Sequence, residues 1–128
     1  MYNRAANVYR QVNASSSPPT RILDELYAGL LQDCESAAER IQAGDRAAKG
    51  RHISRALAIV GELEAALDRK AAPELAQNLA ALYGFSRERL FAANVTMDAK
   101  PLRDVVRVLG PLRDAFAQAA RAAHGGTR

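Results

Sequence analysis

The chain has few side chains that could act as a general base, a nucleophile or a metal ligand. It contains two histidines, His52 and His124, and a single cysteine, Cys34. Hydrolytic or transfer catalysis brings a nucleophile, a base and an orienting group together, and a zinc site needs three or four ligands. His52 follows Arg51 and is predicted to be a solvated helix residue, whereas Cys34 falls at an apolar helical position typical of an inert buried thiol. We therefore expect no enzyme, no metal site and no cofactor.

Motifs that bind iron or phosphate in other proteins are missing too. A di-iron bundle uses inward-facing Glu-x-x-His pairs, and the sequence has none. The interior glycines are isolated, so no Gly-rich phosphate loop is formed. The formal net charge of +4 permits an acidic partner, but the 18 basic residues are scattered without a run of five or six. Binding of nucleic acid is not indicated.

Length and composition favour one small helical domain. A chain of 128 residues supports a single hydrophobic core. It is 48% hydrophobic but only 5% aromatic, without Trp, and its many Ala and Leu residues favour closely packed helices. One cysteine excludes an internal disulfide and fits a reducing compartment. No apolar run approaches the length of a membrane span, and Met1-Tyr2-Asn3-Arg4 lacks the apolar core of a signal peptide, so we expect a cytoplasmic protein without stable membrane insertion.

The elements that position the side chains are predicted from apolar residues repeating at intervals of three and four. Gly44 is predicted to end the first helix in the left-handed conformation, Asp45 to cap the second, and Pro73 and Pro101 to open the third and fourth. Short turns make neighbouring helices antiparallel. The fold class is therefore all-α, an antiparallel four-helix bundle over residues 20–124 with helices at about 20–43, 46–70, 73–95 and 101–123, preceded by an extended or short helical N-terminal arm at 1–19 and followed by a flexible tail at 125–128.

Gly110-Pro111 falls inside the fourth helical pattern. The proline lacks the amide that would bond the carbonyl of Arg107, so the sequence predicts a kink near residues 107–111.

Apolar residues also flank the core stripes of the second and fourth helices. Leu57 and Ile59 lie on the two sides of the second stripe, and Val106 and Val108 on the two sides of the fourth. One interpretation is simply a wider core. The other is an apolar groove that holds an amphipathic polypeptide. Our hypothesis is that part of this groove is lined by Leu57, Ile59, Val60, Val105, Val106, Val108 and Leu109.

Several sequence blocks resemble the bacterial flagellin-specific export chaperones, the FliS family. The segment 73–94 resembles their third helix through Glu74, Asn78, Leu79, Leu82, Tyr83, Arg87, Arg89, Leu90, Ala93 and Asn94. Upstream, the match continues through Tyr9, Ser17, Pro19, Leu26, Tyr27 and Gly29. The second helix matches at Arg55-Ala56, Ile59-Val60-Gly61-Glu62-Leu63 and Leu67-Asp68, and the fourth at Leu112-Arg113-Asp114-Ala115-Phe116. The match covers about residues 9–120, with departures at Ala14, Phe116 and Gly110-Pro111.

This resemblance implies a cytoplasmic chaperone without nucleotide or metal. Its partners would be the disordered C-terminal segment of flagellin, which it keeps from premature polymerisation, and a component of the flagellar type III export gate. We expect Asn78 and Tyr83 to add polar contacts to the groove, and the arm around Tyr9 to cover apolar surface when flagellin is absent. The plainer interpretation makes Tyr27 and Tyr83 core residues with hydroxyls at the rim, and Asn94 a helix terminator.

Two other classes of function remain open. The first is a helical adaptor or regulatory bundle that binds a different amphipathic polypeptide. The second is a small basic nucleic-acid binder, whose affinity would depend steeply on salt. The scattered arginines and the lack of aromatic platforms argue against the second.

Overall fold

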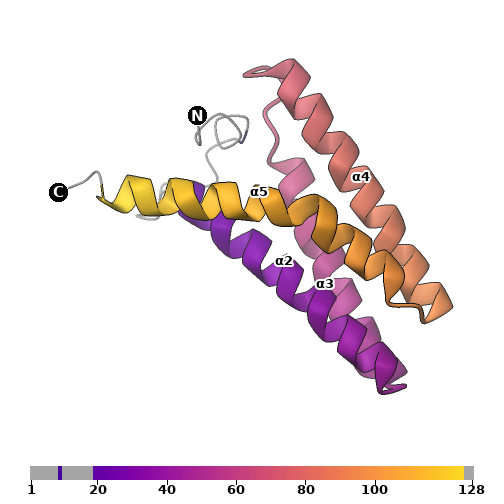
Figure 1. Cartoon of the computed structure of the whole chain (residues 1–128). Coiled ribbons are helices and arrows are strands. Elements are labelled where there is room, and N and C mark those ends of the chain that lie inside the picture. Colours follow the sequence, from indigo (N-terminus) through magenta and orange to yellow (C-terminus); the bar gives the residue numbers. More distant parts are fainter. Residues whose placement is uncertain (1–8, 10–18, 126–128) are drawn as a thin grey trace.

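The computed structural model describes Tyr9 and residues 19–125, and within this part the chain forms four helices and no strand. They are α2 (Pro19–Gln42), α3 (Arg46–Ala65), α4 (Pro73–Thr96) and α5 (Lys100–Gly125). Both α2 and α4 pack against α3 and α5 (Figure 1), so the bundle closes as a ring in which α3 and α5 lie diagonally opposite. The predicted all-α four-helix bundle is confirmed. The arm and tail predictions, apart from Tyr9, Pro19 and residue 125, lie outside the described residues; Pro19, expected in the arm, already belongs to α2.

The predicted helix boundaries at the first two turns have a clear local cause. Gly44 takes a φ of 74°, which a residue without Cβ adopts without strain. The Asp45 side chain then accepts a hydrogen bond of 3.1 Å from the amide of Ala48 and caps α3. Ala72 is extended, as a residue before proline prefers, and Pro73 opens α4.

The end of the second helix differs from the prediction. We expected it to run to residue 70, but α3 ends at Ala65 with a cap at Ala66. The Leu67 amide donates a hydrogen bond of 3.2 Å to the carbonyl of Glu64, and Leu67 forms an isolated antiparallel bridge with Tyr9. The chain thus leaves the helix where the apolar periodicity had favoured a longer one.

The fourth helix continues through its internal proline. Pro111 lies inside α5, and Figure 1 shows that the helix axis changes direction about midway, in keeping with the kink predicted near residues 107–111.

The turn between α4 and α5 has its own local cause. Met97 has a left-handed φ of 56°, and Asp98 accepts a hydrogen bond of 2.9 Å from the amide of Lys100. This turn lets α5 begin one residue before Pro101.

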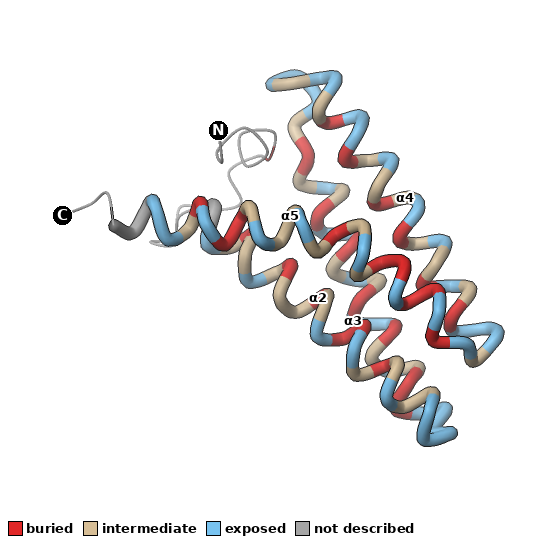
Figure 2. Tube along the Cα trace, in the orientation of Figure 1, coloured by how far each residue is buried: buried red, intermediate tan, exposed pale blue. Residues whose placement is uncertain are grey.

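The core is assembled from buried side chains on all four helices, which Figure 2 shows as red bands that recur along each of them. Burial of one such side chain stabilises the fold by about 1.5 to 3 kcal/mol. Cys34 lies in this core, as predicted, and burial raises the pKa of its thiol to about 12. The largest fully buried side chains are Tyr27, Tyr83, Phe116, Leu30, Ile53, Leu63, Leu90, Leu102, Leu109, Val60 and Val105.

Over the described residues, each helix is too short or too polar to span a lipid bilayer.

Candidate functional site

A tyrosine from the N-terminal arm is inserted into the bundle. The ring of Tyr9 lies edge-on to Phe116 of α5, with 6.1 Å between ring centroids and 72° between planes. The Tyr9 backbone pairs with Leu67, its hydroxyl bonds to Tyr83 of α4, and the residue is only 7% exposed. Tyr9 therefore covers side chains from α4, α5 and the α3–α4 connection with a segment that is not part of the bundle.

Three tyrosine hydroxyls meet beneath this contact. Tyr83 shares hydrogen bonds with Tyr9 and, at 2.5 Å, with Tyr27 of α2. The expectation that the Tyr27 and Tyr83 hydroxyls lie at the rim is wrong, because both residues are fully buried. Burial raises the pKa of Tyr9 to about 12 and raises the pKa of Tyr27 and Tyr83 as well. The hydroxyls thus form a neutral network that links Tyr9 to α2 and α4.

Apart from Tyr9 and Asn78, the predicted partner-binding residues divide into two groups by burial. The first group is fully buried and packs in the core beneath the flanking residues; it consists of Val60, Val105, Leu109 and Tyr83. The four flanking residues are half-buried and pack against the edge of the core; they are Leu57, Ile59, Val106 and Val108. Only the flanking group presents apolar area to a partner without rearrangement.

Two of the flanking residues border α2. Ile59 of α3 faces Gly29 of α2, where an added Cβ would lie 3.5 Å from the Ile59 Cδ1. Val106 lies two turns before Arg113 on α5, and the Nε of Arg113 lies 3.6 Å from a carboxylate oxygen of Asp24 on α2. Residues seven apart share a helix face, so Val106 also points toward α2.

The other two flanking residues border α4. Leu57 lies two turns before Glu64 of α3, which forms an ion pair with Arg87 of α4. Val108 lies one turn after Asp104 of α5, which faces Arg89 of α4. Since residues four or seven apart share a face, both side chains point toward α4. The flanking residues therefore form two apolar strips, one that borders α2 through Ile59 and Val106 and one that borders α4 through Leu57 and Val108. The groove that they were expected to line stays a prediction.

Asn78 and Asn94 are both exposed on α4 but have different surroundings. Asn78 is next to a shallow hollow at the start of the helix, formed with Glu74 and Leu75. Asn94 accepts hydrogen bonds from the ammonium group of Lys49 on its side-chain oxygen at 2.8 Å and on its carbonyl at 3.0 Å. Asn94 is thus a link between α3 and the end of α4, and α4 continues beyond it to Thr96.

His52 is not the solvated residue that we expected. Its Nδ1 lies 3.0 Å from a carboxylate oxygen of buried Asp33 on α2, and the Arg55 guanidinium is 3.8 Å from the other oxygen. This arrangement satisfies a buried acid at the α2–α3 contact. Across the described part of the chain, no three His, Cys, Asp or Glu side chains gather as metal ligands would.

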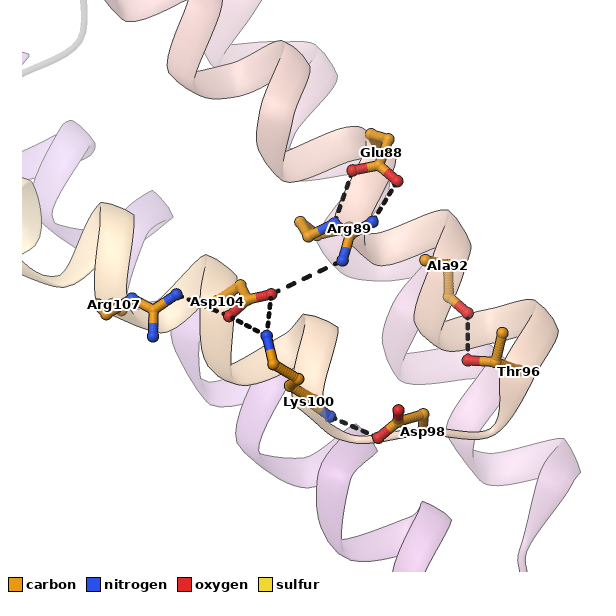
Figure 3. A network of polar contacts seen from close by, with 8 residues as sticks. All are labelled: Glu88, Arg89, Ala92, Thr96, Asp98, Lys100, Asp104 and Arg107. Atoms are coloured by element: carbon orange, nitrogen blue, oxygen red, sulfur yellow. Dashed lines mark hydrogen bonds and ion pairs between the residues drawn. The ribbon is translucent and has the colours of Figure 1, made fainter.

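A polar network joins α4 to α5 near their connecting turn (Figure 3). Buried Asp104 receives Arg107 at 2.8 Å and Lys100 at 3.2 Å from its own helix, and Arg89 of α4 lies 3.7 Å away. Burial alone would raise the pKa of Asp104, but the hydrogen bonds from Lys100 and the charges of Arg107 and Arg89 lower it below its usual range. The charged carboxylate holds the two helices in register.

One apolar surface was missed by the sequence interpretation. Phe85, Phe91 and Val95 are the large apolar side chains that stay exposed on the described residues, at 40%, 53% and 79%. All three belong to α4, and a shallow hollow beside Phe91 is formed by Gly84, Arg87, Glu88, Ala92 and Val95. The signal was present in the sequence, because Phe85 and Phe91 both fall outside the inner stripe of this helix.

Comparisons with known proteins agree with the sequence resemblance. The family model described as "Flagellar protein FliS" matches residues 1–123. The flagellar secretion chaperone FliS of Salmonella typhimurium is 31% identical over 115 residues, covering 86% of this chain and 85% of the relative. The Bacillus subtilis FliS is 31% identical over 111 residues, covering 87% and 82%. The flagellar secretion chaperone FliSB of Pseudomonas aeruginosa is 33% identical over 110 residues, covering 83% and 87%.

Proposed function

This chain belongs to the FliS family of flagellar secretion chaperones, and on that premise we propose that it binds the disordered C-terminal segment of flagellin before export. The family is one of chaperones in flagellar assembly and export, not of enzymes. Bound flagellin would be unable to polymerise prematurely in the cytosol. The chaperone would then deliver it to a component of the flagellar type III export gate.

The observation that carries this proposal is the docking of Tyr9. The contacts of Tyr9 with Tyr83 of α4 and Phe116 of α5 support the proposal that a polypeptide binds at this surface. Flagellin would take the place of the arm, so that an apolar flagellin side chain replaces the Tyr9 ring against Phe116. The arm would thereby keep this surface covered while the partner is absent.

The two apolar strips suit a partner that wraps around the bundle. One strip borders α2 through Ile59 and Val106, and the other borders α4 through Leu57 and Val108. A disordered segment that folds on binding can follow both strips, and its ordering cost keeps the complex releasable. Asn78 would add a polar contact at the start of α4.

Flagellin polymerisation followed by light scattering tests the proposal. An equimolar amount of wild-type protein should suppress polymerisation, whereas Val106→Asp and Val108→Asp should each suppress it less, because a carboxylate is costly to bury against an apolar partner. Glu62→Ala, at an exposed position of α3, is the matched control and should behave as wild type. Unhindered polymerisation with the wild-type protein present would contradict the proposal.

The alternative function is an adaptor for another amphipathic polypeptide. An unrelated amphipathic helical peptide of equal length separates the two functions. The flagellin segment should bind and the unrelated peptide should not; equal binding of both would favour the adaptor.

A further inference from the structure

The place that Tyr9 occupies has a polar end as well as an apolar wall. The ring of Tyr9 lies edge-on to Phe116, and its hydroxyl meets the hydroxyl of Tyr83. Tyr83 in turn shares a hydrogen bond of 2.5 Å with Tyr27, and both of these residues are 0% exposed. An occupant that replaces Tyr9 therefore meets two chemically different surfaces.

The three hydroxyls carry one proton more than their two contacts use. Each hydroxyl has one proton to donate and lone pairs to accept. A chain of donors from Tyr27 through Tyr83 to Tyr9 leaves the spare proton on Tyr9, which keeps 7% of its surface exposed. The opposite direction leaves it on fully buried Tyr27, and a buried donor without an acceptor is costly. Tyr9 is thus the acceptor for Tyr83.

Removal of Tyr9 exposes this requirement. The Tyr83 hydroxyl then directs its proton into the vacated site, where no acceptor of the bundle meets it. A purely aliphatic occupant would pack against Phe116 and leave the Tyr83 proton buried without a partner, so part of its binding free energy would be lost.

We propose that flagellin fills the place of Tyr9 with a neutral side chain that has an apolar body and an oxygen at its tip, either glutamine or tyrosine, and that this oxygen accepts a hydrogen bond from Tyr83. The proposal rests on the function proposed above and specifies the chemistry of the flagellin residue. The body of that side chain packs against Phe116 while the oxygen reaches Tyr83. A glutamate would bring an unpaired charge into a buried site, which costs far more than a neutral group.

The depth of the site indicates a side chain, not a backbone carbonyl, as the source of the oxygen. The Tyr9 backbone lies beside Leu67, with which it forms an antiparallel bridge, whereas its hydroxyl lies at the far end of the ring next to Tyr83. A flagellin backbone that follows the same path past Leu67 keeps its carbonyls at the entrance. The oxygen must therefore stand at the end of a long side chain.

This requirement makes the site selective. A segment that offers only Leu, Ile or Val at this point would displace the arm less well than one that also satisfies Tyr83, because specificity depends on the group that is left unpaired with the wrong partner.

A double-mutant cycle between Tyr83 and the C-terminal flagellin segment tests the proposal. Both full-length proteins carry Tyr9→Ala, so that competition from the arm is the same in each, and one also carries Tyr83→Phe. In calorimetric titrations, Tyr83→Phe should weaken binding of the segment roughly fivefold, the value of one hydrogen bond. Ser86→Ala in the same background removes another buried α4 hydroxyl, which bonds to the Leu82 carbonyl; it is the matched control and should bind like its parent.

The flagellin segment supplies the other half of the cycle. Each of its glutamines is replaced by leucine and each tyrosine by phenylalanine, one at a time. One replacement should weaken binding to the protein with Tyr83 roughly fivefold and have no further effect with Tyr83→Phe, and its position identifies which side chain supplies the oxygen. If Tyr83→Phe proves unfolded by circular dichroism, Tyr27→Phe combined with Tyr83→Phe removes the buried donor left behind and repeats the test.

The outcomes separate this proposal from the function on which it rests. Binding that is equal or tighter with Tyr83→Phe, or a segment without any coupled position, would overturn the hydrogen bond while flagellin binding itself stands. Absence of binding by the parent protein would reject both.

Discussion

Tyr9 combines a ring contact, a backbone pairing and a hydroxyl contact with the bundle. The ring contributes buried apolar area against Phe116. The hydroxyl contributes one hydrogen bond to Tyr83, which retains a second partner in Tyr27. These contributions can be separated by substitution.

Tyr9→Phe should lower the free energy of unfolding by about 1 kcal/mol, because one buried hydrogen bond is lost while the ring stays. Tyr9→Ala should lower it by about 3 kcal/mol or more, since the aromatic ring is removed as well. Urea unfolding of both variants and the wild type measures the two effects. Equal stability of Tyr9→Ala and wild type would mean that the arm does not dock in solution.

High pH should release the same contact. Burial raises the pKa of Tyr9 from 10.0 to about 12 in the folded protein. The stabilisation linked to this shift is fully present below pH 10 and is lost as the pH rises toward 12. A shift of this size corresponds to roughly 3 kcal/mol.

Absorbance of tyrosinate during alkaline titration tests this prediction. The wild type should show a transition near pH 12 that Tyr9→Phe lacks, with loss of helix signal following ionisation. A Tyr9 transition near its ordinary pKa would contradict the buried placement.

At the scale of the helices, the boundaries set by local residues could be predicted from the sequence, whereas the features set by long-range contacts could not. Gly44, Asp45 and Pro73 set boundaries through their own backbone and side-chain chemistry, so sequence alone located them. Just beyond the end of α3, Leu67 pairs with Tyr9, a contact between residues 58 positions apart in the chain that local periodicity could not locate. The pairing of His52 with Asp33 was missed for the same reason.

Lys49 links two helices, because its ammonium group bonds the last turn of α4 from α3. Lys49→Met should lower the free energy of unfolding by about 2 kcal/mol, since a charged hydrogen-bond donor to Asn94 is lost at a buried site and a helix C-terminus loses a nearby cation. Thermal and urea unfolding provide the measurement. Lys70→Met, at an exposed lysine of the α3–α4 connection, is the control and should change stability little. Similar losses of stability in both variants would show that the hydrogen bonds from Lys49 to Asn94 contribute nothing specific.

At the scale of the whole molecule, the four-helix architecture was predictable because each apolar stripe repeats at helical spacing. The placement of the proposed binding surface was only partly predictable. Leu57, Ile59, Val106 and Val108 were recognised as flanking residues, but a single helix does not reveal which neighbour each flank meets. The ring order of the bundle places α3 and α5 on a diagonal, so their flanking residues border α2 on one side and α4 on the other.

The central claim concerns the whole molecule and its partner: this bundle binds the C-terminal segment of flagellin where the Tyr9 arm now docks. Isothermal titration calorimetry of the wild-type protein against that segment, at several temperatures, tests it most directly. We predict one-to-one binding with a large negative heat-capacity change, as coupled folding on an apolar surface produces, and tighter binding for Tyr9→Ala because the competing arm is weakened. Absence of binding by the wild-type protein would contradict the claim.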